Sequence, residues 1–223
     1  MKLQHGTPSD IENASMQIIA QELAASSIRI HKENAAVVRR VIHATADFDY
    51  AFNLRFSDGA VLCGMKALMA HTPIITDTNM ALAGISKPAL GKLRCEAHCF
   101  MADSDIAASA RANGTTRAAA AMEYAAANYP GAIYSIGNAP TALFKLADQI
   151  GAGLRPALVI AVPVGFVNVV EGKERIWRVC LSCGVPIIAA MGRKGGSTVA
   201  AAIANALLYA ASEMQDPAAR GWN

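Results

Sequence analysis

His43 is the residue whose type and setting best suit acid–base chemistry, because it follows Arg40 by three positions on an expected helix from His31 to Ala46. Residues three apart on a helix project from nearly the same face, so an anion held by Arg40 would lie beside the imidazole. Nearby negative charge keeps an imidazole protonated, and an imidazolium donates a proton readily near neutral pH. Alternatively, His43 could be a histidine near the end of a helix whose charge the helix dipole stabilises, without any role in chemistry. The three-residue spacing from Arg40 alone slightly favours this alternative.

A second candidate is the segment 192–197, Gly-Arg-Lys-Gly-Gly-Ser, which joins two cations to three glycines at the start of an expected helix. Such a segment could form a nest for phosphate, but it is not a Walker motif, and no G-x-G-x-x-G pattern follows a strand in this chain. Nucleotide binding is therefore poorly supported. A clamp for a carboxylate fits the same residues equally well.

The segment from Tyr134 to Phe144 is typical of the end of a buried strand, a turn and the start of a helix. Gly137 permits a tight turn, Asn138 is a good N-cap and Pro140 suits the first helical turn. Free backbone N–H groups at such a helix start accept carboxylate or phosphate. An ordinary strand-to-helix connection explains the same residues and is favoured by local features alone. Similar glycine-bearing turns recur along the chain, and this recurrence makes an anion-binding role more plausible than the single segment does.

Arg117 lies in the first turn of an alanine-rich helix that we expect from Thr116 to Asn128, capped by Thr115. A cation in this position opposes the helix dipole and destabilises the helix by roughly a few tenths of a kcal/mol. An unfavourable position indicates another use for the residue, namely an anionic ligand. A solvated surface arginine is an equal alternative.

The cysteines are better explained as core thiols than as metal ligands. Cys95, His98 and Cys99 stand close together, but on an extended strand His98 faces away from the two cysteines. Cys180 and Cys183 lie late in an expected helix, and no further partners stand at zinc spacing. We therefore predict no metal site. The odd number of cysteines, five, favours free thiols in a reducing cytoplasm.

The composition favours one domain that associates with another copy. The chain has 223 residues without a linker-like run, and 53% are hydrophobic, with much of the excess in alanine, while only 17% are charged. A low charge fraction indicates surface that tolerates being covered. The net charge of +3, without a basic run interleaved with aromatics, does not indicate nucleic-acid binding. No stretch resembles a signal peptide, and the longest apolar run, from Ala157 to Val170, is too short to span a bilayer.

The elements that must position these residues alternate between strands and helices in the second half of the chain. We expect strands at 132–136, 157–162 and 186–191, each followed by a glycine-bearing turn and a helix, the second helix from Val169 to Ser182. This alternation predicts an α/β fold with a parallel sheet and helices on both faces. Ligands of such sheets lie beyond the carboxyl ends of the strands, where all these turns fall.

The first half is expected to be mainly helical. A Ser9–Glu12 capping box begins a helix to about Ala25, and Ser57 with Asp58 caps another helix to about His71. Further expected elements are a strand at 73–77, a helix at 79–83, a strand at 92–100, a helix from 104 to about 113, and an irregular or short extended piece at 47–56. We expect a flexible tail at 1–8, one domain at 9–212 and a C-terminal tail at 213–223.

Five segments carry a resemblance to a known family through their order and spacing. They are Arg-Arg-Val-Ile-His (39–43), Thr-Asp-Thr-Asn-Met-Ala-Leu-Ala-Gly-Ile (76–85), Ser-Ile-Gly-Asn-Ala-Pro-Thr-Ala-Leu-Phe (135–144), Val-Pro-Val-Gly-Phe-Val (162–167) and Gly-Arg-Lys-Gly-Gly-Ser (192–197). Together they resemble the precorrin-8X methylmutase family, including its cobalt-precorrin-8 form. The resemblance extends from about Ser9 to Ala211, and five ordered motifs are far more specific than any one of them.

The resemblance implies a flavodoxin-like fold and a homodimer with its active site near the subunit interface. It implies an isomerase of cobalamin biosynthesis that moves a methyl group from C11 to C12 of the corrin ring. The product would be hydrogenobyrinate or cobyrinate, and no external cofactor is needed. The family's catalytic histidine matches His43, its substrate-binding serine and arginine match Ser15 and Arg40, and an arginine that faces the ligand matches Arg117.

The implied substrate is an apolar macrocycle ringed by carboxylates, which gives the cations and helix starts a common use. His43 would protonate a ring nitrogen, or donate a hydrogen bond to it, and so ease the methyl shift. The expected substrate-binding residues are Ser15, Arg40, Thr76, Asp77, Arg117, Gly137, Asn138, Ala139, Pro140, Thr141, Gly165, Arg193, Lys194, Gly195, Gly196 and Ser197.

Two other classes of protein stay open. A tetrapyrrole-binding carrier would need the same cleft and cations but no proton donor. A nucleotide- or phosphate-binding α/β enzyme would use residues 192–197, against which the missing phosphate-loop patterns argue. Within the methylmutase interpretation, the cobalt-containing and the metal-free substrate fit equally well.

Overall fold

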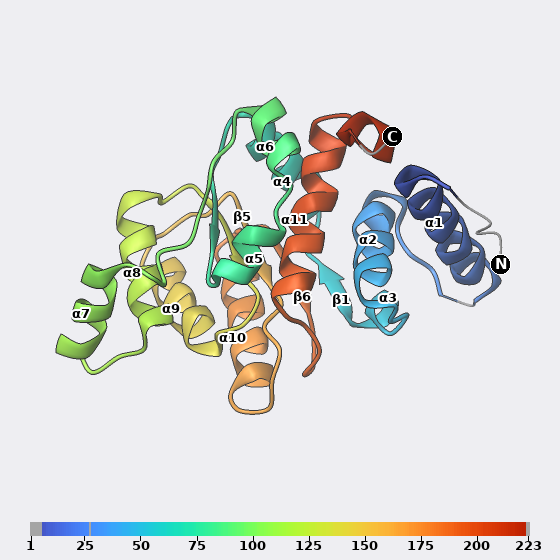
Figure 1. The fold of residues 1–223 in the computed structure, drawn as a ribbon. Helices are drawn as coiled ribbons and strands as arrows, with labels where there is room; N and C mark the ends of the chain where they lie inside the picture. The colour runs from blue at the N-terminus through green and yellow to red at the C-terminus, as the bar shows by residue number, and fades with distance from the viewer. Residues whose placement is uncertain (1–5, 27, 222–223) are drawn as a thin grey trace.

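The chain folds around a six-stranded sheet in the order β1-β6-β5-β4-β2-β3, in a computed structural model that describes residues 6–26 and 28–221 (Figure 1). Neighbouring strands are parallel except at one edge, where β1 runs antiparallel to β6. The predicted parallel sheet is thus confirmed. The strands are β1 (Leu54–Phe56), β2 (Ile74–Thr76), β3 (Ala97–His98), β4 (Ile133–Ile136), β5 (Leu158–Ala161) and β6 (Ile187–Ala190).

Helices cover both faces of the sheet, as the alternation of elements predicts (Figure 1). They are α1 (Pro8–Ala25), α2 (Ala35–Thr45), α3 (Tyr50–Asn53), α4 (Ala60–Met69), α5 (Asn79–Gly84), α6 (Lys87–Leu93), α7 (Ser104–Ala112), α8 (Arg117–Asn128), α9 (Pro140–Gly151), α10 (Val169–Ser182) and α11 (Ser197–Ala211), with the 3-10 helices η1 (Lys32–Asn34) and η2 (Pro217–Arg220). The core on one face of the sheet includes residues of α2, α4, α5, α6 and α11, with α1 packed outside α2, and the core on the other face includes residues of α7, α8, α9 and α10.

Strands β2, β4, β5 and β6 are buried on both sides, which explains their mainly apolar sequences. In β5, Leu158 and Ile160 belong to the core beneath α11, whereas Val159 and Ala161 belong to the core beneath α9 and α10. This alternation follows from the two-residue period of a strand. Alanine is frequent in the helices because small side chains let them lie close to the sheet and to one another, as the buried alanines of α8 and α11 do.

The first helix begins differently from the prediction. Thr7 is its N-cap, with a hydroxyl oxygen that accepts a hydrogen bond from the Asp10 N–H at 3.2 Å, and Pro8 occupies the first helical position. The predicted Ser9–Glu12 capping box is therefore wrong. The physical reason is that the Glu12 side chain is buried and paired with arginines from distant parts of the chain.

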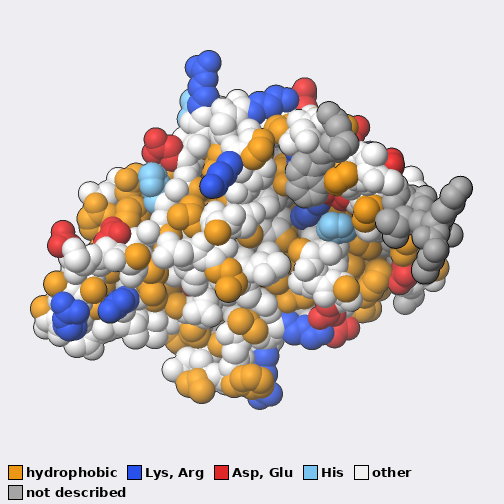
Figure 2. Space-filling model, viewed as in Figure 1, with side chains coloured by type: hydrophobic (Ala, Val, Ile, Leu, Met, Phe, Trp, Pro, Cys, Tyr) orange, Lys and Arg blue, Asp and Glu red, His pale blue; other side chains and the backbone are white. Residues whose placement is uncertain are grey.

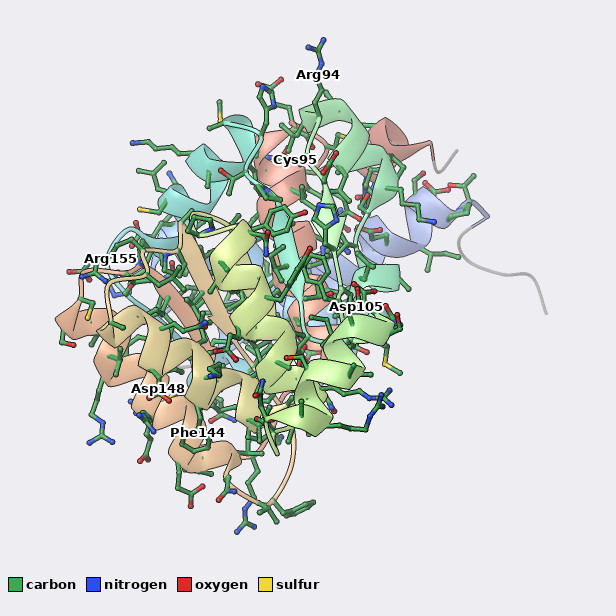
Figure 3. All side chains as sticks on the ribbon, turned by 90° about the vertical axis from the view of Figure 1, so that its left-hand side faces the viewer. Arg94, Cys95, Asp105, Phe144, Asp148 and Arg155 are labelled. Carbon is green, nitrogen blue, oxygen red and sulfur yellow. The ribbon has the colours of Figure 1, made fainter. Side chains whose placement is uncertain are left out.

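Two further local predictions need correction. The Ser57 hydroxyl does not cap α4, because it accepts a hydrogen bond from the Ile187 N–H at 2.9 Å and so extends the pairing of β1 with β6. The strand expected at 92–100 is too long, because Lys92 and Leu93 end helix α6, Arg94 is its C-cap, and only Ala97–His98 is a strand. The Ser86 hydroxyl and a proline in the first turn begin α6 instead. In the figure that shows all side chains, Arg94 projects outward at the end of this helix (Figure 3).

Candidate active site

Ser15 and His43 come from two neighbouring helices and line one cavity. His43 lies in the last turn of α2, and Ser15 lies on α1, where its hydroxyl donates to the carbonyl oxygen of Ile11 at 2.8 Å. The cavity has a volume of about 270 Å³, and Ile18 and Phe48 are among its other walls. The structure thus brings together the predicted catalytic histidine and one predicted substrate-binding residue.

Arg40, one turn before His43, is held inside the chain by a buried ion pair. Its guanidinium lies 2.7 Å from Oε1 of Glu12, and the guanidinium of Arg220 lies at the same distance from the same oxygen. Both guanidiniums lie over the ring of Tyr209, at 5.2 Å and 4.4 Å from its centre. Burial raises the pKa of the Glu12 carboxyl, but hydrogen bonds from Arg220 and Arg40 outweigh it and leave the pKa below its ordinary value.

These contacts set the charge state of His43 in the free protein. Burial lowers the pKa of the imidazole, the positive charges of Arg40 and Arg220 lower it further, and the Glu12 carboxylate acts in the opposite direction. The net effect is a pKa below the ordinary value, which favours the neutral ring. A bound polyanion would reverse this, because negative charge beside the ring favours its cationic form.

The turn at 137–139, predicted to offer free N–H groups to a ligand, is already occupied by Asp77. One carboxylate oxygen accepts the Gly137 N–H at 2.7 Å, and the other accepts the N–H groups of Asn138 and Ala139 at 2.8 Å and 2.7 Å. The prediction that these groups are free is wrong, and so is the prediction that Asn138 is the N-cap, since α9 begins after Ala139. The anion at the start of α9 is therefore the carboxylate of Asp77, which directly follows β2 in the same chain.

The residues around this turn are tightly packed. The Thr76 side chain is fully buried, and its hydroxyl contacts the carbonyl oxygens of Thr78 and His98 at 3.1 Å and 3.2 Å. The Thr78 and Ser197 hydroxyls lie 2.7 Å apart. A Cβ added to Gly137 would lie 2.8 Å from the Cα of Ser197, so only glycine allows this approach of β4 to the start of α11.

The segment 192–196 links the end of α2 to the edge of the sheet. The Lys194 ammonium lies 2.6 Å from carboxylate oxygens of both Asp47 and Asp49, which follow α2 directly. These hydrogen bonds hold the pKa of Lys194 well above its ordinary value. A Cβ at Gly195 would lie 2.1 Å from the carbonyl oxygen of Val162, so this position also requires glycine. Arg193 is exposed, and its guanidinium lies over the ring of Phe166 at 5.5 Å.

Arg117 lies away from His43, on the other side of the sheet. It is the first residue of α8, where its side chain is exposed, and it follows the N-cap Thr116. The Thr116 hydroxyl donates to the Thr141 hydroxyl at 2.8 Å, which ties the start of α8 to the first turn of α9. Since α2 and α8 pack on opposite faces of the sheet, one copy of the chain separates the two predicted ligand contacts.

Comparison with known proteins decides the family. The family model described as precorrin-8X methylmutase matches residues 10–210. The cobalt-precorrin-8 methylmutase of Leptospira interrogans is 40% identical, covering 92% of this chain and 94% of that protein, and the precorrin-8X methylmutase of Pseudomonas aeruginosa is 39% identical, covering 88% and 93%. The chain belongs to the precorrin-8X methylmutase family. It is accordingly an isomerase of cobalamin biosynthesis.

The fold of the chain agrees with that of its family. The crystal structure titled as precorrin-8x methyl mutase from Thermus thermophilus aligns with a TM-score of 0.81 at 41% identity, covering 91% of this chain and 98% of that one. The flavodoxin-like α/β fold that the resemblance implied is thus confirmed.

The cations of this methylmutase fall into two groups by their contacts. Arg40 and Lys194 are paired with carboxylates of the same chain, whereas Arg117 and Arg193 are exposed at the carboxyl edge of the sheet or beside it. Hydrophobic side chains and a cation gather at the lower end of the molecule, where the loop before α10 lies (Figure 2). Val164, Phe166 and Val167 are the exposed hydrophobic residues of that loop.

Two of the five cysteines, Cys95 and Cys180, are buried as expected of core thiols, and Cys63, Cys99 and Cys183 are half-buried. Cys95 is buried, and its thiol donates to the carbonyl oxygen of Leu68 at 3.0 Å. Within residues 6–26 and 28–221, no three His, Cys, Asp or Glu side chains gather as metal ligands. Among the described helices of the methylmutase, none has the length and apolar character needed to cross a membrane.

Sequence reasoning missed Glu12, Arg220 and Lys173. The glutamate was assigned to a helix cap, and the arginine stands in the expected C-terminal tail, whose residues 213–221 are described and whose last two lie outside the described part. In the structure η2 packs against α1, so Arg220 reaches Glu12. Lys173 is a lysine in an otherwise apolar helix face, and that position inside the predicted helix was the one available signal.

Proposed function

We propose that the protein moves a methyl group from C11 to C12 of precorrin-8X or cobalt-precorrin-8, with His43 as the proton donor to the ring. The product is hydrogenobyrinate or cobyrinate, and the reaction takes place in the cytoplasm, in keeping with five free cysteines. The observation that carries this proposal is the shared cavity of Ser15 and His43, with the paired cation Arg40 one turn away.

The protonation state of His43 is expected to change when the substrate binds. In the free protein the pKa of His43 lies below its ordinary value because of burial and the nearby arginines, so the ring is largely neutral at neutral pH. Carboxylates of the corrinoid would raise this pKa when they bind. His43 then becomes protonated when the substrate binds. The protonated ring either transfers its proton to a nitrogen of the corrin ring or donates a hydrogen bond to that nitrogen. Lower electron density in the conjugated system eases migration of the methyl group.

A second copy of the chain is needed to complete the site. The cavity of about 270 Å³ lies below the 300–1,000 Å³ range of typical ligand pockets, and a corrin macrocycle is a large ligand. Ile11 and Ile18 flank Ser15 on one face of α1 and are 53% and 54% exposed. In a homodimer, this face and the cavity would be covered by the partner. The exposed Arg117, separated from His43 within one copy, then serves the ligand from the other.

The reaction itself is the first test. Purified protein is mixed separately with metal-free precorrin-8X and with cobalt-precorrin-8, and the visible spectrum is followed, because the methyl shift changes the ring conjugation. We expect conversion of at least one substrate, and His43→Asn to abolish turnover while product still binds. His31→Asn, which changes an exposed histidine, is the matched control. Binding of both substrates without conversion by the unmodified protein would favour the tetrapyrrole carrier instead.

The dimer is tested through α1. Ile11→Glu places a charge on the exposed face outside the cavity of His43, and we expect it to convert a dimer to a monomer in light scattering and to raise KM strongly. Leu181→Glu, at a residue 50% exposed on α10, is the control for an added surface charge. A monomeric, fully active unmodified protein would exclude the homodimer while leaving the methyl transfer in place.

A further inference from the structure

Lys173 is a fully buried lysine on α10, in a position where charged side chains are rarely found without partners. The helix is fixed to α9 by Arg175, which pairs with Asp148 and lies over the ring of Phe144. Phe144 and Asp148 are labelled on α9 in the view of all side chains (Figure 3). Lys173 therefore extends from a helix that packs against α9 toward the segment 192–196.

The Lys173 ammonium holds the carbonyl groups of the two residues that flank Arg193. It donates to the carbonyl oxygen of Gly192 at 2.9 Å and to that of Lys194 at 2.7 Å. Hydrogen bonds from a charged donor are about twice as strong as neutral ones. Burial lowers the pKa of Lys173 to about 8, so the side chain is mostly charged at neutral pH.

Other contacts fix the rest of the segment 192–196. The Gly196 N–H donates to the carbonyl oxygen of Val162 at 2.8 Å, and the Gly165 N–H donates to the carbonyl oxygen of Arg193 at 3.2 Å. The Arg193 carbonyl thus meets the loop before α10, while its side chain points away to the ring of Phe166, which is 83% exposed. Gly192 and Gly196 are held through their backbones, and Lys194 is held through both its carbonyl oxygen and its side chain.

We propose that Lys173 is a positioning residue of the methylmutase site, holding the segment 192–196 so that Arg193 presents its guanidinium, beside the Phe166 ring, to a carboxylate of the corrinoid. The part that concerns the substrate rests on the proposed function. The part that concerns the segment does not, because it follows from the hydrogen bonds of Lys173 alone.

The need for a lysine follows from the two carbonyl groups. A methionine has nearly the same length but donates no hydrogen bond, so both carbonyl oxygens would lose their partner inside the protein. The segment would then open toward water, and the guanidinium would no longer be held over Phe166. Arg193 itself would remain in the chain, but its position would become variable.

Hydrogen exchange tests the segment without any substrate. Exchange of the Gly165 and Gly196 amides is compared in the unmodified protein, in Lys173→Met and in Ile176→Val. The last variant trims a buried residue of the same helix that lies in the core beneath the sheet, so it controls for loss of packing. We expect faster exchange at both amides in Lys173→Met only. Equal protection in all three proteins, or equal loss in both variants, would overturn the proposal.

Steady-state kinetics test the link to the substrate. Lys173→Met and Arg193→Ala should each raise KM roughly tenfold with little change in kcat, the size expected for one lost charge-assisted contact. The double variant should be no worse than Arg193→Ala, because Lys173 acts through Arg193. If the two substitutions raise KM multiplicatively in the double variant, or if Lys173→Met lowers kcat at unchanged KM, Lys173 does not act by positioning Arg193. If Lys173→Met does not fold, Lys173→Gln, which keeps N–H donors, replaces it with a smaller expected rise in KM.

The two measurements separate the two proposals. Failure of the unmodified protein to convert either corrinoid would remove the proposed function, but the exchange result at Gly165 and Gly196 would still decide the role of Lys173. Conversion with normal KM in Lys173→Met would leave the methylmutase intact and remove the positioning role.

Discussion

The carboxylate of Asp77 accepts a hydrogen bond from the backbone N–H of Gly137 at 2.7 Å, across 60 residues of sequence. With its other oxygen on the next two N–H groups, it fills the start of α9 from within the chain. Side-chain oxygens that satisfy helix N-terminal donors normally come from the N-cap residue itself. Here a strand end supplies the oxygen and ties two neighbouring strands, β2 and β4, at their carboxyl ends.

Replacing Asp77 therefore tests a role in stability. Asp77→Asn keeps one acceptor oxygen but turns an amide group toward N–H donors, and we expect it to lower the free energy of unfolding by about 2 to 3 kcal/mol. KM should change less than about twofold, since no group of Asp77 is left for the ligand. Denaturation in urea and steady-state kinetics measure the two effects, with the exposed Asp105→Asn as control. A large rise in KM at unchanged stability would show that this turn binds substrate after all.

The buried Glu12 pairs predict a second, larger loss of stability. Glu12→Gln leaves the guanidiniums of Arg40 and Arg220 near one another without their shared carboxylate. We expect the free energy of unfolding to fall by about 3 to 5 kcal/mol, as for other buried pairs that lose one partner. Loss of the carboxylate should also lower the pKa of His43, followed by NMR of its ring protons. The exposed Glu174→Gln is the control, and a higher pKa of His43 would contradict the assignment.

His43 predicts how stability depends on pH. Its pKa in the folded protein lies below the ordinary 6.5 because of burial and the nearby arginines. Below about pH 6.5 the unfolded chain then binds more protons, so the free energy of unfolding falls as pH falls, by at most about 1.4 kcal/mol per pH unit. Urea denaturation between about pH 5 and pH 7.5 should show this slope, and His43→Asn should reduce it. A slope of the opposite sign, or one unchanged in the variant, would exclude the assignment.

The close packing at Gly137 leads us to expect a steric cost for a larger residue there, and Gly151 in α9 provides a control. Gly137→Ala places a Cβ 2.8 Å from the Cα of Ser197, so the backbone of α11 must move, and we expect a loss of roughly 1–3 kcal/mol in the free energy of unfolding. Gly151→Ala, at the end of α9, meets no atom within 4 Å and should be neutral or slightly stabilising. Thermal unfolding compares the two. Equal stability of both variants would show that β4 and α11 can separate at little cost.

The sequence predicted those features that depend on neighbours along the chain. The helix expected at Val169–Ser182 has those bounds in the structure, and the strands of the three strand–helix units lie within a residue of their expected ends. Period and capping chemistry decide such elements locally. The antiparallel edge strand β1 was expected only as an irregular or short extended piece, because three residues carry too little pattern to fix a partner or a direction.

The sequence by itself determined the family and the α/β architecture, because ordered motifs and hydrophobic periods can be recognised without knowledge of contacts. It also predicted the site residues Ser15 and His43, which line one cavity in the structure. Only the tertiary structure decided which polar groups are available. Asp77 occupies the turn at Gly137, and the Glu12 carboxylate is shared between Arg40 and Arg220, which lies 208 residues away from Glu12. The physical reason is that a charge or an N–H group is satisfied by whatever folding brings within hydrogen-bond distance, and local sequence does not contain that distance.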